Sequence, residues 1–350
     1  MINFCTLFDS NYLTRGLVLY ESLKRCCPSF QLFVVAFDDK CYGILSQIRL
    51  PNLVLISLKE FEDEKLLEVK PTRSAAEYCW TCTPAIISYC ISSFNLDACT
   101  YIDADMEFYM NPQIIIDEAK GDSVIITGHR YTKEYDQSDS NGIYCVQFMY
   151  FRNDKRGQDA LEWWRERCLE WCFDRHEDGK FGDQKYLDDW PVRFKGVHVS
   201  EHEGCGVAPW NIQRYFAARQ EDTLTIKRKD NGQEFPVIFF HFHGLKFFTD
   251  GVVSLSGSLY ELDPEVKNAV YYPYVERLLQ MEKNLKTVIQ TGNINGARKR
   301  SPAKKTILKN YIIERLFQFK GGRISLFQLL NLNFKKHFHY QKILNDGDIS

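Results

Sequence analysis

The chain has 350 residues, of which 45% are hydrophobic and 26% are charged, and this length suffices for one large domain or two ordinary ones. Its 25 Phe, 19 Tyr and 6 Trp are too many to leave in water, so the composition excludes a chain that is disordered throughout. The 44 Lys and Arg nearly balance the 46 Asp and Glu, which gives a net charge of −2.

This net charge conceals an uneven distribution. Residues 298–350 contain 12 Lys and Arg against 3 Asp and Glu, a charge of +9, so the rest of the chain carries −11. Only the basic tail suits an anionic surface, and the acidic body does not. Nowhere do about 18 apolar residues run together, so the sequence predicts no membrane-spanning helix.

Twelve cysteines are scattered from Cys5 to Cys205 through apolar segments, and the first residues lack the basic region and apolar run of a signal peptide. We therefore expect a cytoplasmic protein whose reduced thiols pack as small apolar side chains. Cys79 and Cys82 form a C-x-x-C pair, but the pair lies in a helical pattern and has no second pair. A redox or zinc role for it is the less favoured alternative.

The first half of the chain alternates apolar runs with helical patterns. The runs predict strands at residues 2–8, 31–37, 53–57, 98–102 and 123–127. The helical patterns cover residues 13–24, a stretch that ends at residue 45, and residues 75–93. This alternation predicts an α/β fold with a doubly wound, mostly parallel sheet, in which ligands bind at the carboxyl ends of the strands.

The pattern loosens beyond residue 128, where the polar residues 132–142 indicate a flexible loop. Further elements are predicted as strands at 145–151 and 236–242 and as helices at 154–172 and 263–289. Residues 292–303 are turn-rich and charged, and we interpret them as a linker between a catalytic domain, residues 1–291, and a basic tail, residues 304–350. Within the tail, residues 304–319 have the pattern of a basic amphipathic helix, and a second apolar segment follows at 324–334.

Two carboxylates, Asp103 and Asp105, directly follow the predicted strand 98–102. Residues two apart on an extended segment face the same side, so both carboxylates can converge on one ion. Oxygen ligands suit Mg²⁺ or Mn²⁺, especially when substrate phosphates complete the coordination. Solvated acids in a turn are the alternative interpretation.

Four segments, in this order, resemble glycosyltransferase family 8, whose members have the GT-A fold. They are Asp9-Ser10-Asn11-Tyr12, Tyr101-Ile102-Asp103-Ala104-Asp105, Gly182-Asp183-Gln184 and His241-Phe242-His243-Gly244. The resemblance covers roughly residues 2–250, and its strength lies in the ordered set of four. It implies a GT-A type fold, with a Rossmann-like, mostly parallel central sheet flanked by helices and followed here by the helical basic tail.

The resemblance also implies roles for individual residues. Asp103, Asp105 and His241 would hold Mn²⁺ or Mg²⁺, with His243 as the alternative histidine. Asp183 and Gln184 would be the catalytic residues beside the donor sugar. The nucleotide and the rest of the donor would contact Thr6, Asp9, Asn11, Tyr12, Arg73, Ala104, Gly244 and Lys246.

The residues by themselves leave structural alternatives open. Asp9 is equally suited to capping the helix that follows it, and His241 lies in an apolar strand where a core histidine is the usual explanation. Trp210 can stack on a sugar face while Asn211 bonds a hydroxyl, or both can belong to a structural turn.

Three positions depart from the pattern of the family. Gly244-Leu245-Lys246 is one residue shorter than the usual G-x-x-K. Trp80 stands where the family often has an arginine, and Lys185 stands where it often has a second acid. Because all three positions are expected near the donor, they leave the donor sugar unidentified.

These features predict a metal-dependent hexosyltransferase that moves a hexose from a nucleotide-diphosphate sugar, most simply a UDP-sugar, to a hydroxyl acceptor. The resemblance implies retention of configuration, and we expect a role in surface polysaccharide or lipopolysaccharide assembly. The acceptor would be a glycan or a lipid-linked glycan. Residues 298–336 would dock on the anionic inner face of the cell membrane, or alternatively pack on the acidic body.

Two other functions compete with this one. A non-catalytic sugar-nucleotide binder or membrane-associated assembly protein would be expected to lack a metal ligand, whereas all three are present. A sugar nucleotidyltransferase would favour a Gly-rich phosphate loop after the first strand, and residues 8–12 do not form one. Nucleic-acid binding is not expected, because no aromatic stacking motif accompanies the basic tail.

Overall fold

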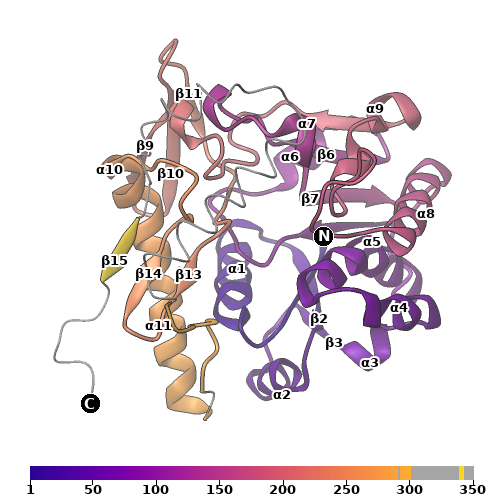
Figure 1. The fold of residues 1–350 in the computed structure, drawn as a ribbon, viewed down its shortest axis with the longest axis horizontal. Helices are drawn as coiled ribbons and strands as arrows, with labels where there is room; N and C mark the ends of the chain where they lie inside the picture. The colour runs from indigo at the N-terminus through magenta and orange to yellow at the C-terminus, as the bar shows by residue number, and fades with distance from the viewer. Residues whose placement is uncertain (291, 301–338, 343–350) are drawn as a thin grey trace.

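The computed structural model describes residues 1–290, 292–300 and 339–342 (Figure 1). Its centre is a seven-stranded sheet, whose strands in spatial order are β3 (Leu53–Ser57), β2 (Phe30–Ala36), β1 (Ile2–Phe8), β4 (Ala98–Ile102), β7 (Tyr144–Arg152), β6 (Val124–Gly128) and β8 (Val197–Ser200). All neighbouring pairs are parallel except the two that β7 forms with β4 and β6. The predicted α/β fold with a mostly parallel central sheet is therefore confirmed.

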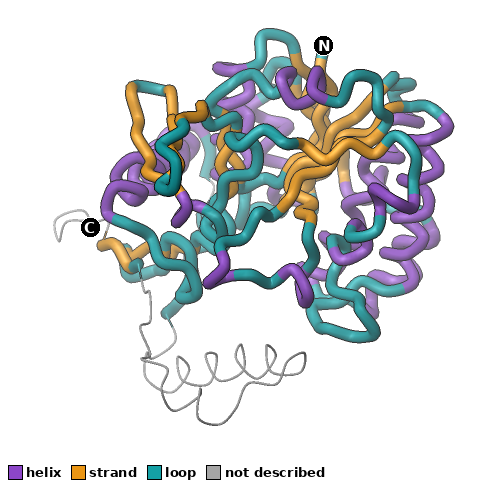
Figure 2. The backbone as a smooth tube through the Cα atoms, turned by 90° about the horizontal axis from the view of Figure 1, so that it is seen from above, coloured by secondary structure: helices purple, strands orange, loops and turns teal. Residues whose placement is uncertain are grey.

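Helices cover both faces of this sheet, because successive side chains of a strand point to opposite sides (Figure 2). Phe4 of β1 packs with α1 (Leu13–Cys26) and α2 (Asp39–Ile48), and α11 (Tyr272–Val288) packs on α1. Cys5, the next residue of β1, packs with α5 (Ala75–Ser93) and α8 (Lys155–Glu170) on the other face. The core therefore consists of two apolar layers with the sheet between them.

Smaller sheets flank the centre. β5 (Met106–Phe108) pairs with β12 (Phe239–His241). A second group contains β9 (Tyr215–Gln220), β10 (Thr223–Arg228) and β11 (Glu234–Pro236), and a third contains β13 (Lys246–Phe247), β14 (Val252–Ser254) and β15 (Tyr340–Lys342). The remaining short elements are α3 (Leu58–Phe61), α4 (Glu64–Val69), η1 (Lys70–Thr72), α6 (Gln113–Glu118), η2 (Lys133–Tyr135), α7 (Ser138–Asn141), η3 (Lys185–Leu187), α9 (Trp190–Arg193), η4 (Ile212–Arg214), α10 (Pro264–Val266) and η5 (Lys267–Tyr271).

Several elements differ from their predicted form. The helix expected over 263–289 is divided into α10, the π-helical turn η5 and α11. Pro273 explains the break, because proline has no N–H to donate and its ring displaces the carbonyl four residues earlier. The segment 132–142, which was expected to be a loop, contains two helical turns, η2 and α7.

The structure describes residues 292–300 of the predicted linker, and these residues pack against the predicted catalytic domain. Ile294 is fully buried in the main core, and its carbonyl accepts a hydrogen bond from the N–H of Thr14. The predicted tail is described at residues 339–342, where β15 pairs with β14. The predicted helix at 304–319 and the apolar segment at 324–334 lie outside the described residues, and the proposed domain boundaries stay a prediction.

Across the described part of the chain, no helix combines the length and the apolar character needed to cross a membrane.

Candidate metal and sugar-nucleotide site

Two acidic segments meet at one edge of the central sheet. β1 ends at Phe8 and is followed by Asp9, and β4 ends at Ile102 and is followed by Asp103. Because β1 and β4 are parallel neighbours, their carboxyl ends lie at the same edge. Ligands of α/β sheets bind at this edge, so the 9–12 loop and the D-x-D segment, residues 103–105, lie where a ligand is expected.

The short β5–β12 sheet brings a histidine to the same place. His241 of β12 pairs with Met106 of β5, the residue that follows Asp105. The N–H of Phe242 donates to the carbonyl of Asp105 at 2.9 Å, which fixes the two segments against each other. Met106 and His241, which are 135 positions apart in sequence, are thus held side by side by backbone pairing.

Asp103, Asp105 and His241 form a compact cluster of metal-ligating groups. One ligand atom from each lies within 4.8 Å of the other two. His241 Nε2 is 3.1 Å from Asp105 Oδ1 and 3.7 Å from Asp103 Oδ2. Two carboxylates and an imidazole suit Mn²⁺ or Mg²⁺, and the two half-buried carboxylates leave one side of the cluster open to a substrate oxygen.

The charges in this cluster depend on one another. Burial lowers the pKa of His241, but the carboxylates of Asp105 and Asp103 outweigh it and hold that pKa well above the usual value. Burial raises the pKa of Asp105, whereas His241 lowers it to about 2. Burial, with the charge of Asp105, raises the pKa of Asp103. The imidazole of His241 therefore carries a proton, whose positive charge balances the negative charge of the two acids. A bound metal cation would supply that positive charge instead.

Gln147 orients the histidine. Its Nε2 donates to Thr127 Oγ1 at 3.3 Å, which leaves its Oε1 to accept a hydrogen bond from His241 Nδ1 at 3.0 Å. The other ring nitrogen, Nε2, consequently faces the acids. Gly206 leaves the space for this contact, because a Cβ at that position would lie 2.6 Å from Gln147 Nε2. Sequence reasoning missed Gln147, although a polar residue within the apolar run of β7 was its signal.

Asp183 lies close enough to Asp103 for their charges to interact, and Gln184 follows it in the chain. Asp183 is buried, and burial, reinforced by the nearby charge of Asp103, raises its pKa to about 8. Its carbonyl accepts a hydrogen bond from the indole of Trp164 at 2.9 Å. Gln184 donates its amide N–H to the carbonyl of Asn141 at 2.7 Å, which leaves its Oε1 for another contact.

The raised pKa of Asp183 predicts a pH-dependent stability. Between its ordinary pKa and about 8, the folded protein holds a proton on Asp183 that the unfolded chain has released, so rising pH destabilises the fold. In metal-free buffer, Asp183→Asn should therefore gain stability relative to wild type as pH rises from 5 to 8, by up to about 1.4 kcal/mol per pH unit. Urea unfolding at several pH values measures this, and a difference that does not change with pH would refute it.

The 9–12 loop is organised by Asp9. Its Oδ1 accepts from the backbone N–H of Asn11 at 3.0 Å and of Tyr12 at 3.2 Å, and its Oδ2 accepts from the Asn11 amide at 2.8 Å. Tyr12, and not Asp9, is the N-cap residue of α1. Asp9 therefore shapes the loop instead of capping the helix, and it leaves the ring of Tyr12 exposed.

Comparisons with known proteins found two curated relatives and a solved structure with the same fold. No family model matches the chain. The chain is 29% identical to the uncharacterized protein YfnD of Bacillus subtilis (strain 168) over 280 residues, which cover 79% of this chain and 88% of YfnD. It is 30% identical to the uncharacterized protein YfnF of the same organism over 251 residues, which cover 69% of this chain and 81% of YfnF. The chain belongs to the same family as YfnF.

The fold is also that of a solved structure, the galactosyltransferase LgtC in complex with donor and acceptor sugar analogs. The match has a TM-score of 0.50 and 14% sequence identity, and it covers 83% of this chain and 98% of LgtC. The chain therefore has the GT-A fold that the resemblance implied.

Thr6, Ala104 and Arg73 were also predicted to contact the donor. Thr6 and Ala104 are buried, and the Thr6 hydroxyl has no hydrogen-bond partner among the described residues. Arg73 lies against the end of α8, because it donates to the carbonyl of Leu169 at 3.1 Å and its guanidinium lies 3.9 Å from the ring centre of Phe173. These contacts hold the side chain of Arg73 against α8 and Phe173.

Residues 242–245 form a turn that leads from β12 to β13. Gly244 lies in this turn, and Lys246 begins β13 with an exposed side chain. The ring centre of His243 is 5.8 Å from that of His241, and its side chain is exposed. The cluster of possible metal ligands contains His241, and the preference for His241 over His243 stays a prediction.

Trp210 and Asn211 are both buried and both bonded within the protein. The indole N–H of Trp210 and the amide of Asn211 each donate to the carbonyl of His129 at 2.9 Å. Asn211 Oδ1 accepts from the N–H of Ala208, and its amide also donates to the carbonyl of Gly206. This bonding favours the structural alternative, in which both residues hold the turn behind His241.

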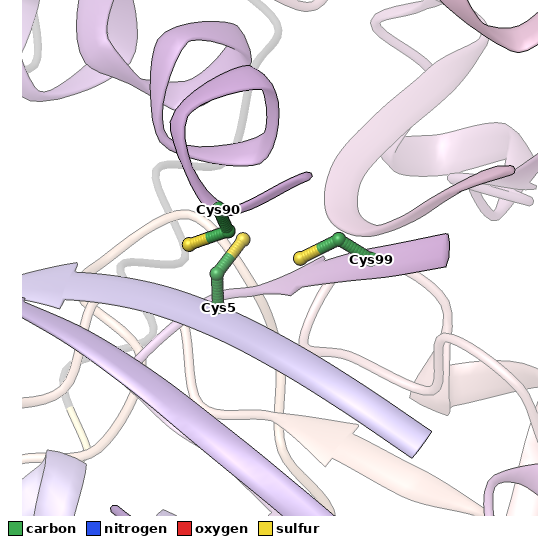
Figure 3. Close-up of side chains that lie close together, drawn as sticks. All are labelled: Cys5, Cys90 and Cys99. Carbon is green, nitrogen blue, oxygen red and sulfur yellow. The ribbon is translucent and has the colours of Figure 1, made fainter. Parts of the chain in front are cut away.

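A second cluster consists of Cys5, Cys90 and Cys99, whose sulfur atoms come from β1, α5 and β4 (Figure 3). All three are completely buried between the sheet and α5. Burial raises the pKa of Cys5 and Cys90. Burial also opposes ionisation of Cys99, but hydrogen bonds with the other two thiols lower its pKa to about 5, so the cluster favours one thiolate and not the three that a metal would need. Together with the free state of all twelve cysteines, this supports the prediction that the thiols pack as small apolar side chains.

Proposed function

We propose that the protein is a metal-dependent glycosyltransferase that transfers a hexose from a nucleotide-diphosphate sugar to a hydroxyl acceptor. The observation that carries this proposal is the convergence of Asp103, Asp105 and His241 at the carboxyl edge of the sheet. Two further observations support it. The fold matches that of LgtC, whose solved structure holds donor and acceptor sugar analogs, and the 9–12 loop lies at the same edge.

Departure of the leaving group is the step that needs most assistance, because a diphosphate gains negative charge as the glycosidic bond breaks. Mn²⁺ or Mg²⁺ held by Asp103, Asp105 and His241 would supply the neutralising charge. Lys246, next to the 242–245 turn, is the candidate for a second contact to the diphosphate. Asp9, Asn11 and Tyr12 would bind the nucleoside, for which UDP is the proposed carrier.

Asp183 and Gln184 would lie on the sugar side of the site. Asp183 would bind hydroxyl groups of the donor. Gln184 would lie near the anomeric carbon, and its Oε1 takes no part in the hydrogen bond to Asn141. An amide is a weak nucleophile, so we propose retention by attack on the same face from which the diphosphate departs. NMR of the product linkage tests this point, and an inverted anomer would refute it.

Mass spectrometry after incubation with a panel of nucleotide sugars tests the function. With Mn²⁺ we expect one UDP-sugar to be consumed, by hydrolysis or by transfer to an added glycan, and with EDTA we expect no consumption. Unchanged consumption of the sugar nucleotide in EDTA would show that the reaction needs no metal ion. The failure of every sugar nucleotide to be consumed or bound would contradict the proposal as a whole.

We further propose a cytoplasmic enzyme that acts on a lipid-linked glycan in surface polysaccharide or lipopolysaccharide assembly, docked on the inner membrane face through residues 298–336. The charge of +9 on residues 298–350 supports this placement. Substituting Ser for Lys304, Lys305 and Lys309 should release the protein from vesicles that contain phosphatidylserine, at roughly 1 kcal/mol per lysine. Sedimentation with vesicles measures this, and equal partitioning of wild type and variant would refute membrane docking.

A further inference from the structure

Arg15 is a buried cation in the first turn of α1, and within the described residues its side chain contacts neutral groups. Its exposed fraction is 3%. Its guanidinium donates to three backbone carbonyls, those of Asn11 at 3.4 Å, Asn295 at 3.1 Å and Leu245 at 3.1 Å. Within the described residues no carboxylate lies within ion-pair distance of it. Its guanidinium carbon also lies 4.5 Å from the ring centre of Tyr12 and 5.6 Å from that of Phe247, so carbonyl groups and aromatic rings, and no acid among the described residues, stabilise this buried charge.

The three carbonyls belong to three segments that surround the candidate site. Asn11 is part of the 9–12 loop, and Leu245 closes the 242–245 turn directly before Lys246. That turn begins at Phe242, whose N–H donates to the carbonyl of Asp105. Arg15 thus links the loop proposed for the nucleoside to the turn that carries the metal-ligand segment.

The third segment, residues 292–297, packs closely on the same loop. Gly296 has a φ of 69°, and a Cβ at this position would lie 3.1 Å from the carbonyl oxygen of Asn11. The N–H of Thr14 donates to Ile294 at 3.3 Å, and Lys40 donates to the carbonyl of Asn293 at 2.7 Å. These contacts hold residues 292–297, which include the Asn295 carbonyl that accepts from Arg15, against the 9–12 loop, α1 and α2.

We propose that Arg15 is a positioning residue for the diphosphate of the donor, because it fixes the 9–12 loop against the 242–245 turn and places a permanent positive charge between them. This inference rests on the proposed function. A diphosphate joins the nucleoside to the metal, so it must cross the interval between these two segments. A positive charge buried there interacts strongly with an incoming anion, because little water screens it.

The test compares the binding of UDP and of uridine, which lacks phosphates, by ligand-observed NMR in the presence of the diamagnetic ion Mg²⁺. Arg15→Gln removes the charge and keeps hydrogen-bond donors, and it should weaken UDP binding by about 10-fold or more while changing uridine binding by less than about 3-fold. Arg15→Lys keeps the charge and should bind UDP within about 3-fold of wild type. Arg193→Gln, an exposed charge removal on α9, is the matched control and should change neither affinity.

Equal losses of UDP and uridine binding in Arg15→Gln would overturn the inference, since they would show a loop that is merely disordered. Unchanged UDP binding would overturn it as well. If Arg15→Gln does not fold, Arg15→Lys decides, and a loss of UDP affinity well beyond about 3-fold would then contradict the role of the charge. Wild-type protein that binds no UDP at all would refute the proposed function itself, which separates the two failures.

Discussion

Asp105→Asn is expected to lower the turnover of the donor by about 100-fold or more. Asp105 Oδ1 lies 3.1 Å from His241 Nε2, and its side chain is only 14% exposed. Asparagine preserves the shape of this side chain but removes the charge that a divalent cation needs. Release of UDP at saturating donor concentration, measured over a range of Mn²⁺ concentrations, records the effect on both turnover and metal requirement.

The matched control for this variant is Asp97→Asn. Asp97 precedes β4 at the opposite end of the same strand, and it is exposed. Its substitution removes the same charge from the same element, so it should leave turnover unchanged. Turnover of Asp105→Asn within about 3-fold of the control would rule out Asp105 as a metal ligand.

Glu107→Gln is expected to lower the free energy of unfolding by about 3 kcal/mol, because it removes the charge of a fully buried carboxylate that accepts hydrogen bonds from two arginines. Glu107 is completely buried. Its Oε1 accepts from Arg277 at 2.6 Å and from Arg25 at 3.3 Å, and its Oε2 accepts from the hydroxyl of Tyr109 at 2.9 Å. These contacts hold β5 against α1 and α11, so urea unfolding should detect their loss directly.

Glu21→Gln provides the comparison for Glu107. Glu21 also forms a salt bridge, with Lys24 at 3.6 Å, but both side chains are largely exposed. Exposed ion pairs contribute about 0–1 kcal/mol, so this variant should unfold close to wild type. Similar small losses in both variants would show that the buried network around Glu107 contributes little to stability.

The parts of the fold that local sequence predicts best are the buried strands. β1, β3 and β4 have the predicted bounds because each is an apolar run that ends at a polar residue or a turn. α5 also has its predicted bounds, and Ser74 with Glu77 forms the capping box at its start. In each case the determining interactions lie within a few residues of the element itself.

The elements that differ depend on contacts between distant residues. The predicted strand 236–242 is shortened to β12, because Pro236 belongs to β11 while Phe239 to His241 pair with β5. Only the fold places β5 and β12 side by side, and no local pattern indicates the pairing.

The residues of the candidate site were likewise predicted in part from local sequence and missed where they depend on distant contacts. Spacing alone placed Asp103 and Asp105 on one side of a strand end, and the resemblance added His241, which the structure brings within 3.1 Å of Asp105. Gln147 and Arg15 were missed because their importance comes from burial and from partners far along the chain. Trp210 was a candidate for sugar stacking because its exposure could not be known from sequence, and it is buried.

Mn²⁺ binding measured by electron paramagnetic resonance, with and without UDP, most directly tests whether the protein and the donor share one metal. The wild type should bind a single Mn²⁺, and UDP should tighten that binding by about 10-fold or more, because its phosphate oxygens complete the coordination. Asp105→Asn should lose this coupling. Mn²⁺ affinity that is the same with and without UDP, in a protein that binds both, would contradict a metal shared by Asp103, Asp105, His241 and the diphosphate.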